Sequence, residues 1–229
     1  SLPNARVTSA QNVAPGTFAP AGATGSAGPA PVFAKLPEFC RIAATLTPSS
    51  DSDIKIEVWL PATGWNGKFQ AVGNGGWAGN IPYPAMANAV LAGYATAGTD
   101  TGHVGGTAAF ALGHPEKVVD FGYRAVHEMT VKAKSIVDAF YGSAPTLSIW
   151  NGCSQGGRQG ITEAVRFPTD FDGIIAGAPA VNGVHLHAGR VAINRAVNAT
   201  PASAIPASKY PFIHQAVLAA CDAKDGVTD

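Results

Sequence analysis

Four short segments in the middle of the chain are apolar without alternation. They cover residues 69–72, 94–97, 147–151 and 173–177, and each ends at or beside a glycine. Continuous apolar runs of this length are typical of strands buried on both faces, as in parallel sheets covered by helices. Residues 54–60 instead alternate apolar and polar side chains, which predicts a half-exposed strand near the edge of the sheet.

Two helical segments fall between these strands. From residue 118 to residue 140 apolar side chains recur at steps of three and four, which predicts a long amphipathic helix. Gly142 follows it and can supply the left-handed cap that ends a helix. A second helical stretch covers residues 158–167. Strands alternating with helices in this way predict an α/β fold with a mostly parallel sheet.

The ends of the chain differ from its middle. Residues 1–31 are rich in Ala, Gly, Pro, Ser and Thr, which predicts an irregular N-terminal arm. The α/β domain is expected over residues 32–220, and residues 221–229 form a separate acidic segment. The first residues show neither an initiator Met nor a secretory signal pattern, so we expect a mature or trimmed start.

Composition excludes several classes of protein. Of 229 residues, 46% are hydrophobic and only 13% are charged, which is typical of a well-packed globular chain rather than a disordered one. The formal net charge is zero, so no electrostatic footprint for nucleic acid or an anionic membrane is present. No apolar run reaches the roughly 18 residues that a membrane-spanning helix needs. We therefore expect a small, neutral or weakly charged ligand.

The most informative motif lies between the third buried strand and the second helix. Residues 152–157 read Gly-Cys-Ser-Gln-Gly-Gly. A serine flanked by glycines at a strand-to-helix corner is typical of a nucleophile elbow, because only residues without a Cβ fit beside so tight a turn. The motif predicts an α/β-hydrolase fold with Ser154 as the nucleophile. A merely structural glycine-rich turn is the alternative.

A serine nucleophile needs two backbone N–H groups to hold the oxyanion that forms during acyl transfer. In this fold one donor is the residue after the nucleophile, here Gln155, and the other comes from a loop after an earlier strand. Gly75 and Gly76, in the glycine-rich segment 73–79, are placed to supply the second, and Gly76 is the one we select. An ordinary turn is the alternative for this segment. Trp77 beside it is a candidate either for an aromatic acyl pocket or for simple packing.

The serine also needs a base and an acid, which follow it along the chain in this fold. The candidates downstream of Ser154 are His185, His187, His214, Asp170, Asp172, Asp222, Asp225 and Asp229. None is convincing, because the remaining chain is too short for the further strands that normally carry the acid and the histidine. The earlier histidines, His103, His114 and His127, are expected to be structural.

The number of cysteines is odd. The chain has Cys40, Cys153 and Cys221. Either one thiol is free or disulfide partners are missing. A free thiol at Cys153, beside the nucleophile, is open to oxidation, which favours a disulfide from Cys153 to another active-site segment.

Two longer segments extend the elbow. Gly152–Gly160 is followed by the run Phe-Pro-Thr-Asp-Phe-Asp-Gly-Ile-Ile-Ala-Gly-Ala-Pro-Ala at 167–180, and Gly-His-Pro-Glu at 113–116 leads into Asp-Phe-Gly-Tyr-Arg-Ala-Val-His at 120–127. This combination resembles the tannase and feruloyl esterase family, which also includes the bacterial enzyme that hydrolyses mono(2-hydroxyethyl) terephthalate. The resemblance runs from about Leu2 to Asp229. It implies that Cys153 bonds to a cysteine just after the catalytic histidine.

The last residues resemble the start of the family's structural calcium loop. By that resemblance the carboxylates of Asp222, Asp225 and Asp229 and the carbonyl of Val227 would bind Ca²⁺. Hard oxygen donors suit this ion, although it takes six to eight of them and the chain offers fewer. Without the resemblance, a solvated acidic terminus is an equal alternative.

The resemblance implies that further parts lie outside residues 1–229. The lid domain, the triad acid and histidine, and the partners of Cys153 and Cys221 would follow Asp229, and the partner of Cys40 would precede Ser1. We therefore expect a fragment, a processed light chain or an N-terminal part that is inactive alone.

The function implied is that of a secreted or periplasmic serine carboxylesterase acting on feruloyl, galloyl or terephthalate half-esters. An acyltransferase or peptidase on the same fold, or an inactive calcium-stabilised binding fragment, are the alternatives.

Overall fold

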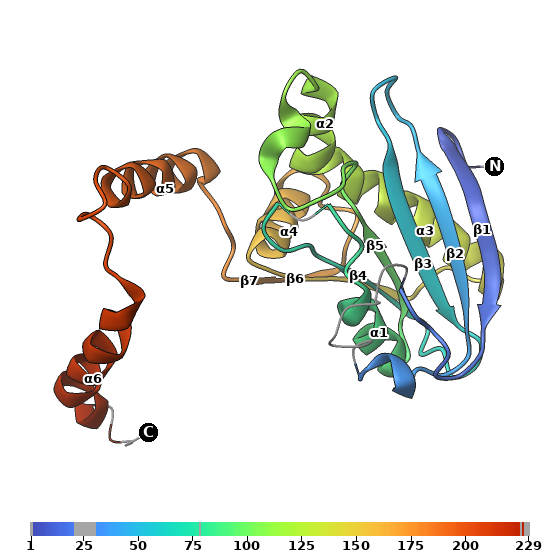
Figure 1. The fold of residues 1–229 in the computed structure, drawn as a ribbon. Helices are drawn as coiled ribbons and strands as arrows, with labels where there is room; N and C mark the ends of the chain where they lie inside the picture. The colour runs from blue at the N-terminus through green and yellow to red at the C-terminus, as the bar shows by residue number, and fades with distance from the viewer. Residues whose placement is uncertain (1, 21–30, 78, 225, 227–229) are drawn as a thin grey trace. The chain divides into compact units, whose positions relative to one another are not determined.

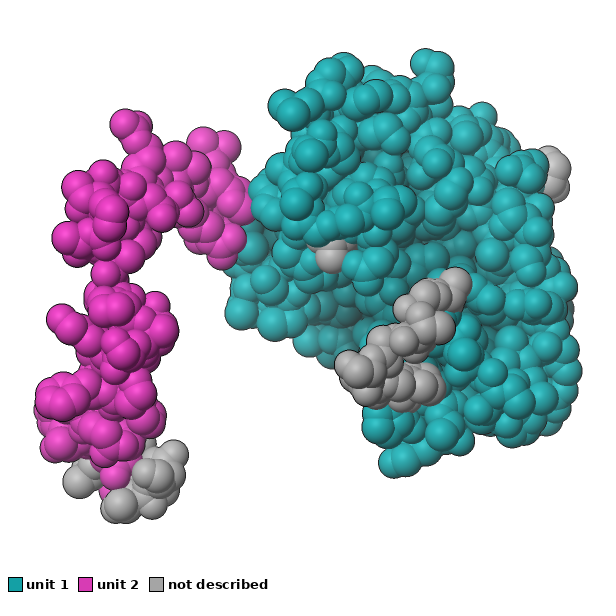
Figure 2. All heavy atoms as spheres, viewed as in Figure 1, with its two compact units in different colours: residues 1–180 teal, residues 181–229 magenta. Residues whose placement is uncertain are grey.

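The computed structural model describes residues 2–20, 31–77, 79–224 and 226. The elements form two compact units, Ser1–Ala180 and Val181–Asp229 (Figure 2). The first unit contains a seven-stranded sheet flanked by helices, and the second contains two helices (Figure 1). The strands are β1 Ala5–Val13, β2 Phe39–Leu46, β3 Ile54–Pro61, β4 Lys68–Val72, β5 Ala95–Thr99, β6 Leu147–Cys153 and β7 Gly173–Gly177.

The helices lie between and after these strands. The α-helices are α1 Tyr83–Leu91, α2 Pro115–Val119, α3 Ala125–Tyr141, α4 Gln155–Arg166, α5 Gly183–Val197 and α6 Tyr210–Cys221. A π-helical turn, Asp120–Arg124, joins α2 to α3. Short 3-10 turns cover Phe33–Lys35, Ala108–Ala111, Ala207–Lys209 and Asp222–Lys224. None of the described helices is both long and apolar enough to cross a membrane.

The sheet has the order β1-β2-β3-β5-β4-β6-β7. Along this order the first three neighbouring pairs, from β1 to β5, are antiparallel. The last three pairs, from β5 to β7, are parallel. The parallel half confirms the predicted parallel sheet, and β4 and β5 are largely buried as expected. Strand β7 is not buried on both faces, because it lies at the edge of the sheet with no buried residue. Because parallel strands all end at one edge of the sheet, the loops after β4 and β6 meet there, and β4 and β6 are direct neighbours.

Helices cover both faces of the sheet. On one face α1 packs over a cluster that includes Phe39, Trp59 and Met86. On the other face α3 and α4 pack over a cluster that includes Met129, Trp150 and Phe171. Successive side chains of a strand point to opposite faces of the sheet, so one strand contributes to both clusters. In β3, Val58 belongs to one cluster and Trp59 to the other.

The predicted helix at 118–140 is confirmed as α3, although its start is divided into α2 and the π-helical turn. Gly142 ends α3 as expected, with φ of 71° and its amide donating to the Asp138 carbonyl at 2.9 Å. The second predicted helix begins three residues earlier than expected, at Gln155. Its first turn contains Gly156 and Gly157, and the low helix propensity of glycine hides this start in the sequence.

Two predictions about the N-terminal half are wrong. The supposed irregular arm contains β1, a nine-residue strand on the edge of the sheet, and residues 21–30 of it lie outside the described residues. Strand β3 is not near the edge, because β1 and β2 lie outside it. Its polar residue Glu57 is buried, since Arg41 Nε at 2.7 Å, Trp59 Nε1 at 2.8 Å and Tyr83 OH at 2.9 Å all donate to its carboxylate.

The described residues of the second unit include no buried apolar side chain. Neither α5 nor α6 has a buried residue, and Val184 and Phe212 are each 83% exposed. The other large apolar side chains that are exposed on these helices are Leu186, Val191, Ile193, Val197, Tyr210, Ile213 and Val217. Helices with this much uncovered apolar surface are stabilised by packing against further protein.

Candidate active site

Ser154 lies at the corner between β6 and α4. Its φ of 59° and ψ of −114° are a conformation that non-glycine residues rarely adopt, and such strain costs about 1–3 kcal/mol. Three backbone hydrogen bonds hold it: Ser154 N donates to Gly177 O at 2.9 Å, and Ser154 O accepts from Arg158 N and Ala180 N, both at 3.0 Å. The side chain is exposed. The fold thus holds a strained backbone that presents a hydroxyl to solvent.

Glycines surround this corner because the backbones touch. A Cβ on Gly152 would lie 2.5 Å from the carbonyl oxygen of Gly156, and one on Gly156 would lie 3.0 Å from the Cα of Gly73. A Cβ on Gly157 would lie 2.3 Å from the carbonyl oxygen of Gly177. The structure therefore has no room for side chains at these glycines, as the elbow motif predicts. The turn has the geometry that this motif requires.

The loop after β4 is attached to the elbow by a buried amide pair. Gln159 Nε2 donates to Asn74 Oδ1 at 2.9 Å, and Asn74 N donates to Gln159 Oε1 at 3.0 Å. Asn74 O also accepts from Gly156 N at 2.8 Å, and Asn74 Nδ2 donates to Thr99 O at 2.8 Å. Asn74 thereby connects the loop after β4 both to α4 and to the end of β5. Sequence alone did not identify Asn74 and Gln159 as a pair. The only sequence signal for this pair is that each of the two glycine-rich segments contains an amide side chain.

This pair gives a first prediction. Gln159→Leu leaves the buried polar groups of Asn74 without their partner, so the free energy of unfolding should fall by about 1–3 kcal/mol. Urea titration of the full-length protein measures it. The same substitution at Gln11, an exposed residue of β1, is the control and should change stability by less than about 0.5 kcal/mol. Equal effects of the two substitutions would show that the amide pair does not stabilise this corner.

The predicted oxyanion donors lie in the two segments that this pair joins. Gly75 and Gly76 are exposed, and Gly76 has φ of 57°, which glycine adopts without strain. Gln155 begins α4, so its amide is one of the N–H groups that a helix N-terminus leaves without an intrahelical acceptor. Within the described residues neither the Gly76 nor the Gln155 amide donates to a backbone carbonyl. The positive end of the α4 dipole at this point favours a developing negative charge.

Aromatic side chains gather beside the same loop. Trp77 stacks on Phe121 with ring centroids 5.2 Å apart, and both lie near Phe110. His103 stacks on Phe110 at 3.8 Å, and its Nε2 is 2.7 Å from the Trp77 carbonyl oxygen. Trp77 therefore packs in an aromatic cluster, as one of the two predictions for it required, and this cluster adjoins the proposed oxyanion loop.

Arg158 fixes the start of α4 against the π-helical turn. Its Nη1 donates to Gly122 O at 2.9 Å and its Nη2 to Phe121 O at 3.0 Å, while Nε donates to Gln155 Oε1 at 3.0 Å. Burial lowers the pKa of its guanidinium, which still retains its charge at neutral pH. The aromatic cluster and the elbow are thereby connected through one side chain.

The triad candidates of the first unit have structural partners. Asp170 Oδ2 is 2.7 Å from His127 Nδ1, and Asp172 Oδ2 accepts from Ser148 N at 2.7 Å. Both carboxylates hold the segment between α4 and β7 in place. His103 and His114 also have partners, the latter in Asp51 at 3.0 Å, as predicted for structural histidines.

The remaining candidates lie in the second unit. His185 Nδ1 is 2.9 Å from Asn182 Oδ1, and His187 and Asp222 also have interactions. Of the expected calcium ligands, Asp222 begins the 3-10 turn Asp222–Lys224, and Asp225, Val227 and Asp229 lie outside the described residues. The calcium loop therefore stays a prediction.

The three cysteines are described, and no two of them are joined by a disulfide. Cys153 and Cys221 are exposed, whereas Cys40 is partly buried, which raises the pKa of its thiol. Disulfides to partners outside residues 1–229 stay predictions.

Known proteins resemble this chain over most or all of its length. The model of the family described as tannase and feruloyl esterase matches residues 40–229. An uncharacterised esterase of Xanthomonas campestris pv. campestris is 42% identical over 231 residues, which cover all of this chain and 39% of that protein. Feruloyl esterase B of Aspergillus niger is 38% identical over 193 residues, which cover 84% of this chain and 37% of that enzyme.

Solved structures agree with these matches. The crystal structure of feruloyl esterase B from Aspergillus oryzae superposes with a TM-score of 0.87 at 36% identity, covering 100% of this chain and 45% of that one. Tannin acyl hydrolase from Aspergillus niger superposes with a TM-score of 0.75 at 25% identity, covering 98% and 42%. The chain thus spans less than half the length of these relatives.

Proposed function

Because the chain belongs to the tannase and feruloyl esterase family, we propose that the protein containing it is a serine carboxylesterase that hydrolyses esters of aromatic acids. The observation that carries this proposal is the strained, exposed Ser154 at the corner between β6 and α4, held by backbone hydrogen bonds to Gly177, Arg158 and Ala180. Feruloyl esterases and tannin acyl hydrolase among the similar proteins support the reaction class.

The proposed reaction has two halves. A histidine from the remainder of the protein takes the proton of Ser154 as its Oγ attacks the ester carbonyl, and the N–H groups of Gly76 and Gln155 stabilise the oxyanion. The C–O bond to the alcohol then breaks, and the histidine returns the proton to the departing alcohol. Water attacks the acyl-enzyme in the same way, which releases the acid and restores Ser154.

An aromatic acyl group is the substrate feature that the structure supports. The cluster of Trp77, Phe110 and Phe121 adjoins the loop that carries Gly76. Aromatic pairs contribute about 0.5–1.5 kcal/mol beyond the area that they bury. A feruloyl, galloyl or terephthaloyl ring bound near this cluster would gain such contacts, whereas a short aliphatic acyl group would not.

The test is a comparison of methyl esters that differ only in the acyl group. With the full-length protein, kcat/KM for methyl ferulate or methyl gallate should exceed that for methyl butyrate by about 2- to 10-fold, as one aromatic contact predicts. Ester hydrolysis followed by release of methanol measures both. Faster turnover of the butyrate ester would contradict an aromatic acyl site while leaving the serine esterase intact.

We further propose that the remainder of the protein packs on the second unit and supplies the lid, the triad acid and the histidine. The exposed apolar side chains of α5 and α6 support this packing. In the first unit, β7 is an edge strand whose Ile175 is 57% exposed, so we propose that further strands of the remainder extend the sheet there. The same proposal includes the calcium loop beginning at Asp222, disulfides for the three thiols, and secretion or a periplasmic location. Residues 1–229 alone are then expected to lack activity.

A further inference from the structure

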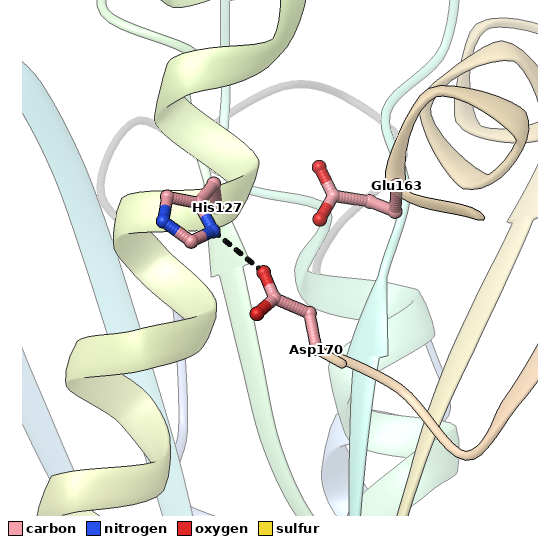
Figure 3. A group of neighbouring side chains, drawn as sticks. All are labelled: His127, Glu163 and Asp170. Carbon is pink, nitrogen blue, oxygen red and sulfur yellow. Dashed lines mark hydrogen bonds and ion pairs between the residues drawn. The ribbon is translucent and has the colours of Figure 1, made fainter. Parts of the chain in front are cut away.

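Three side chains capable of binding a metal converge beneath α4, apart from the elbow. His127 comes from α3, Glu163 from α4, and Asp170 from the segment that follows α4. One ligand atom from each lies within 4.8 Å of the other two. Figure 3 shows the Glu163 carboxylate pointing from its helix toward the His127–Asp170 pair. His127 precedes Glu163 and Asp170 by more than 35 residues, so the tertiary fold brings the imidazole to the two carboxylates.

Glu163 is the unusual member of this cluster. The residue is only 1% exposed, and both of its carboxylate oxygens are buried without a hydrogen-bond partner among the described residues. An unpartnered carboxylate in such a place is costly unless a proton or a cation neutralises it.

The surroundings supply little positive charge to Glu163 itself. His127 Nδ1 lies 2.7 Å from Asp170 Oδ2, and Lys134 Nζ donates to the backbone carbonyl of Asp170. Phe167 stacks on the His127 ring at 3.9 Å, which fixes the plane of the imidazole with Nδ1 facing Asp170. No described N–H group donates to the Glu163 carboxylate, and the His127 imidazole and the Asp170 carboxylate are held in position beside it.

We propose that His127, Glu163 and Asp170 bind a divalent transition-metal ion of the Zn²⁺ type. One imidazole and two carboxylates match the ligands that Zn²⁺ takes, at about 2.0–2.2 Å each. Ligand atoms around a tetrahedral ion at that distance are about 3.4 Å apart, so separations within 4.8 Å need only small side-chain movements. The side chain of His127 is 30% exposed, which leaves a path for the ion and for a water as fourth ligand.

Such an ion would connect α3, α4 and the segment leading to β7. Two of these elements, α4 and the segment leading to β7, adjoin the elbow at Ser154. The ion would therefore stabilise the fold around the elbow without contacting the reacting atoms. Its ligands are different residues from those of the expected calcium loop that begins at Asp222. The two sites also differ in chemistry, because His127 offers an imidazole nitrogen whereas Ca²⁺ takes oxygen ligands.

The test uses the full-length protein after chelator treatment, with excess Ca²⁺ restored so that a calcium site stays filled. Calorimetric titration with ZnCl₂ should show one bound ion, and the Tm should rise with zinc concentration. CoCl₂ should give visible absorption bands that are absent without protein. Glu163→Gln resembles the protonated acid in shape, so the metal-free variant should fold at least as stably as the parent and should lose zinc affinity by about 10-fold or more.

His114→Ala is the matched control, because His114 also pairs with an aspartate, Asp51, but belongs to no group of three metal-binding side chains among the described residues. Zinc binding should persist in this variant. The proposal is overturned if neither zinc nor cobalt binds, or if Glu163→Gln binds zinc as tightly as the parent. The second outcome would place the ion elsewhere, for instance at the thiols, and would leave Glu163 as a buried protonated acid.

Discussion

Replacement of Ser154 by alanine is expected to lower kcat for ester hydrolysis by about 10⁴-fold or more, the usual effect of removing a serine nucleophile. The reason is that no acyl-enzyme can form without the Oγ, although the donors at Gly76 and Gln155 remain. Initial rates of methyl ferulate hydrolysis by the full-length protein measure the change. Substrate binding should be largely kept.

Ser135→Ala is the control for this substitution. Ser135 is exposed on α3, and its hydroxyl donates only to the Val131 carbonyl of the same helix, at 3.0 Å. The variant should retain the parent's kcat. If Ser154→Ala keeps more than about one-tenth of the parent rate, the elbow is a structural turn and another group carries the chemistry.

The second large effect is expected from Gly157→Ala. The new Cβ would lie 2.3 Å from Gly177 O and 2.8 Å from Pro179 Cα, both backbone atoms that cannot rotate away. Such overpacking should lower the free energy of unfolding by about 3 kcal/mol, at the upper end of the usual range for overpacked cores. Moving α4 away from β7 would also displace Ser154, so activity should fall with stability. Urea titration of the full-length protein measures the first effect.

Gly173→Ala provides the matched comparison. Gly173 begins β7, and nothing lies within 4 Å of a Cβ built on it. This variant should differ from the parent by less than about 0.5 kcal/mol. Equal stability of Gly157→Ala and Gly173→Ala would show that α4 does not pack as closely on the β7 loop as described.

The elbow was predictable because its cause is local. The Gly-x-Ser-x-Gly spacing between a strand and a helix allows one tight turn, and the structure has that turn at Ser154 with φ of 59°. The parallel strands were predictable for a similar reason, since short continuous apolar runs are typical of strands in a sheet that helices cover on both faces. These features depend on residues within about ten positions of one another, a range in which sequence pattern is informative.

The parts that sequence did not predict depend on distant partners. Strand β1 is polar and mostly exposed, and only its pairing with β2 makes it a strand. Glu57 is buried because Arg41 and Tyr83 donate to it. The His127 cluster needs Asp170, which is 43 positions away. Such contacts follow from the tertiary fold, and local pattern carries no trace of them.

The most direct test of the proposed function is covalent labelling of the full-length protein with a fluorophosphonate, followed by peptide mass spectrometry. These reagents add to a serine that is activated by a base and stabilise the adduct in the oxyanion site. The account predicts one label on Ser154, loss of esterase activity in proportion to labelling, and no label on Ser154→Ala. A label on another serine, or full esterase activity in a protein whose Ser154 stays unlabelled, would contradict it.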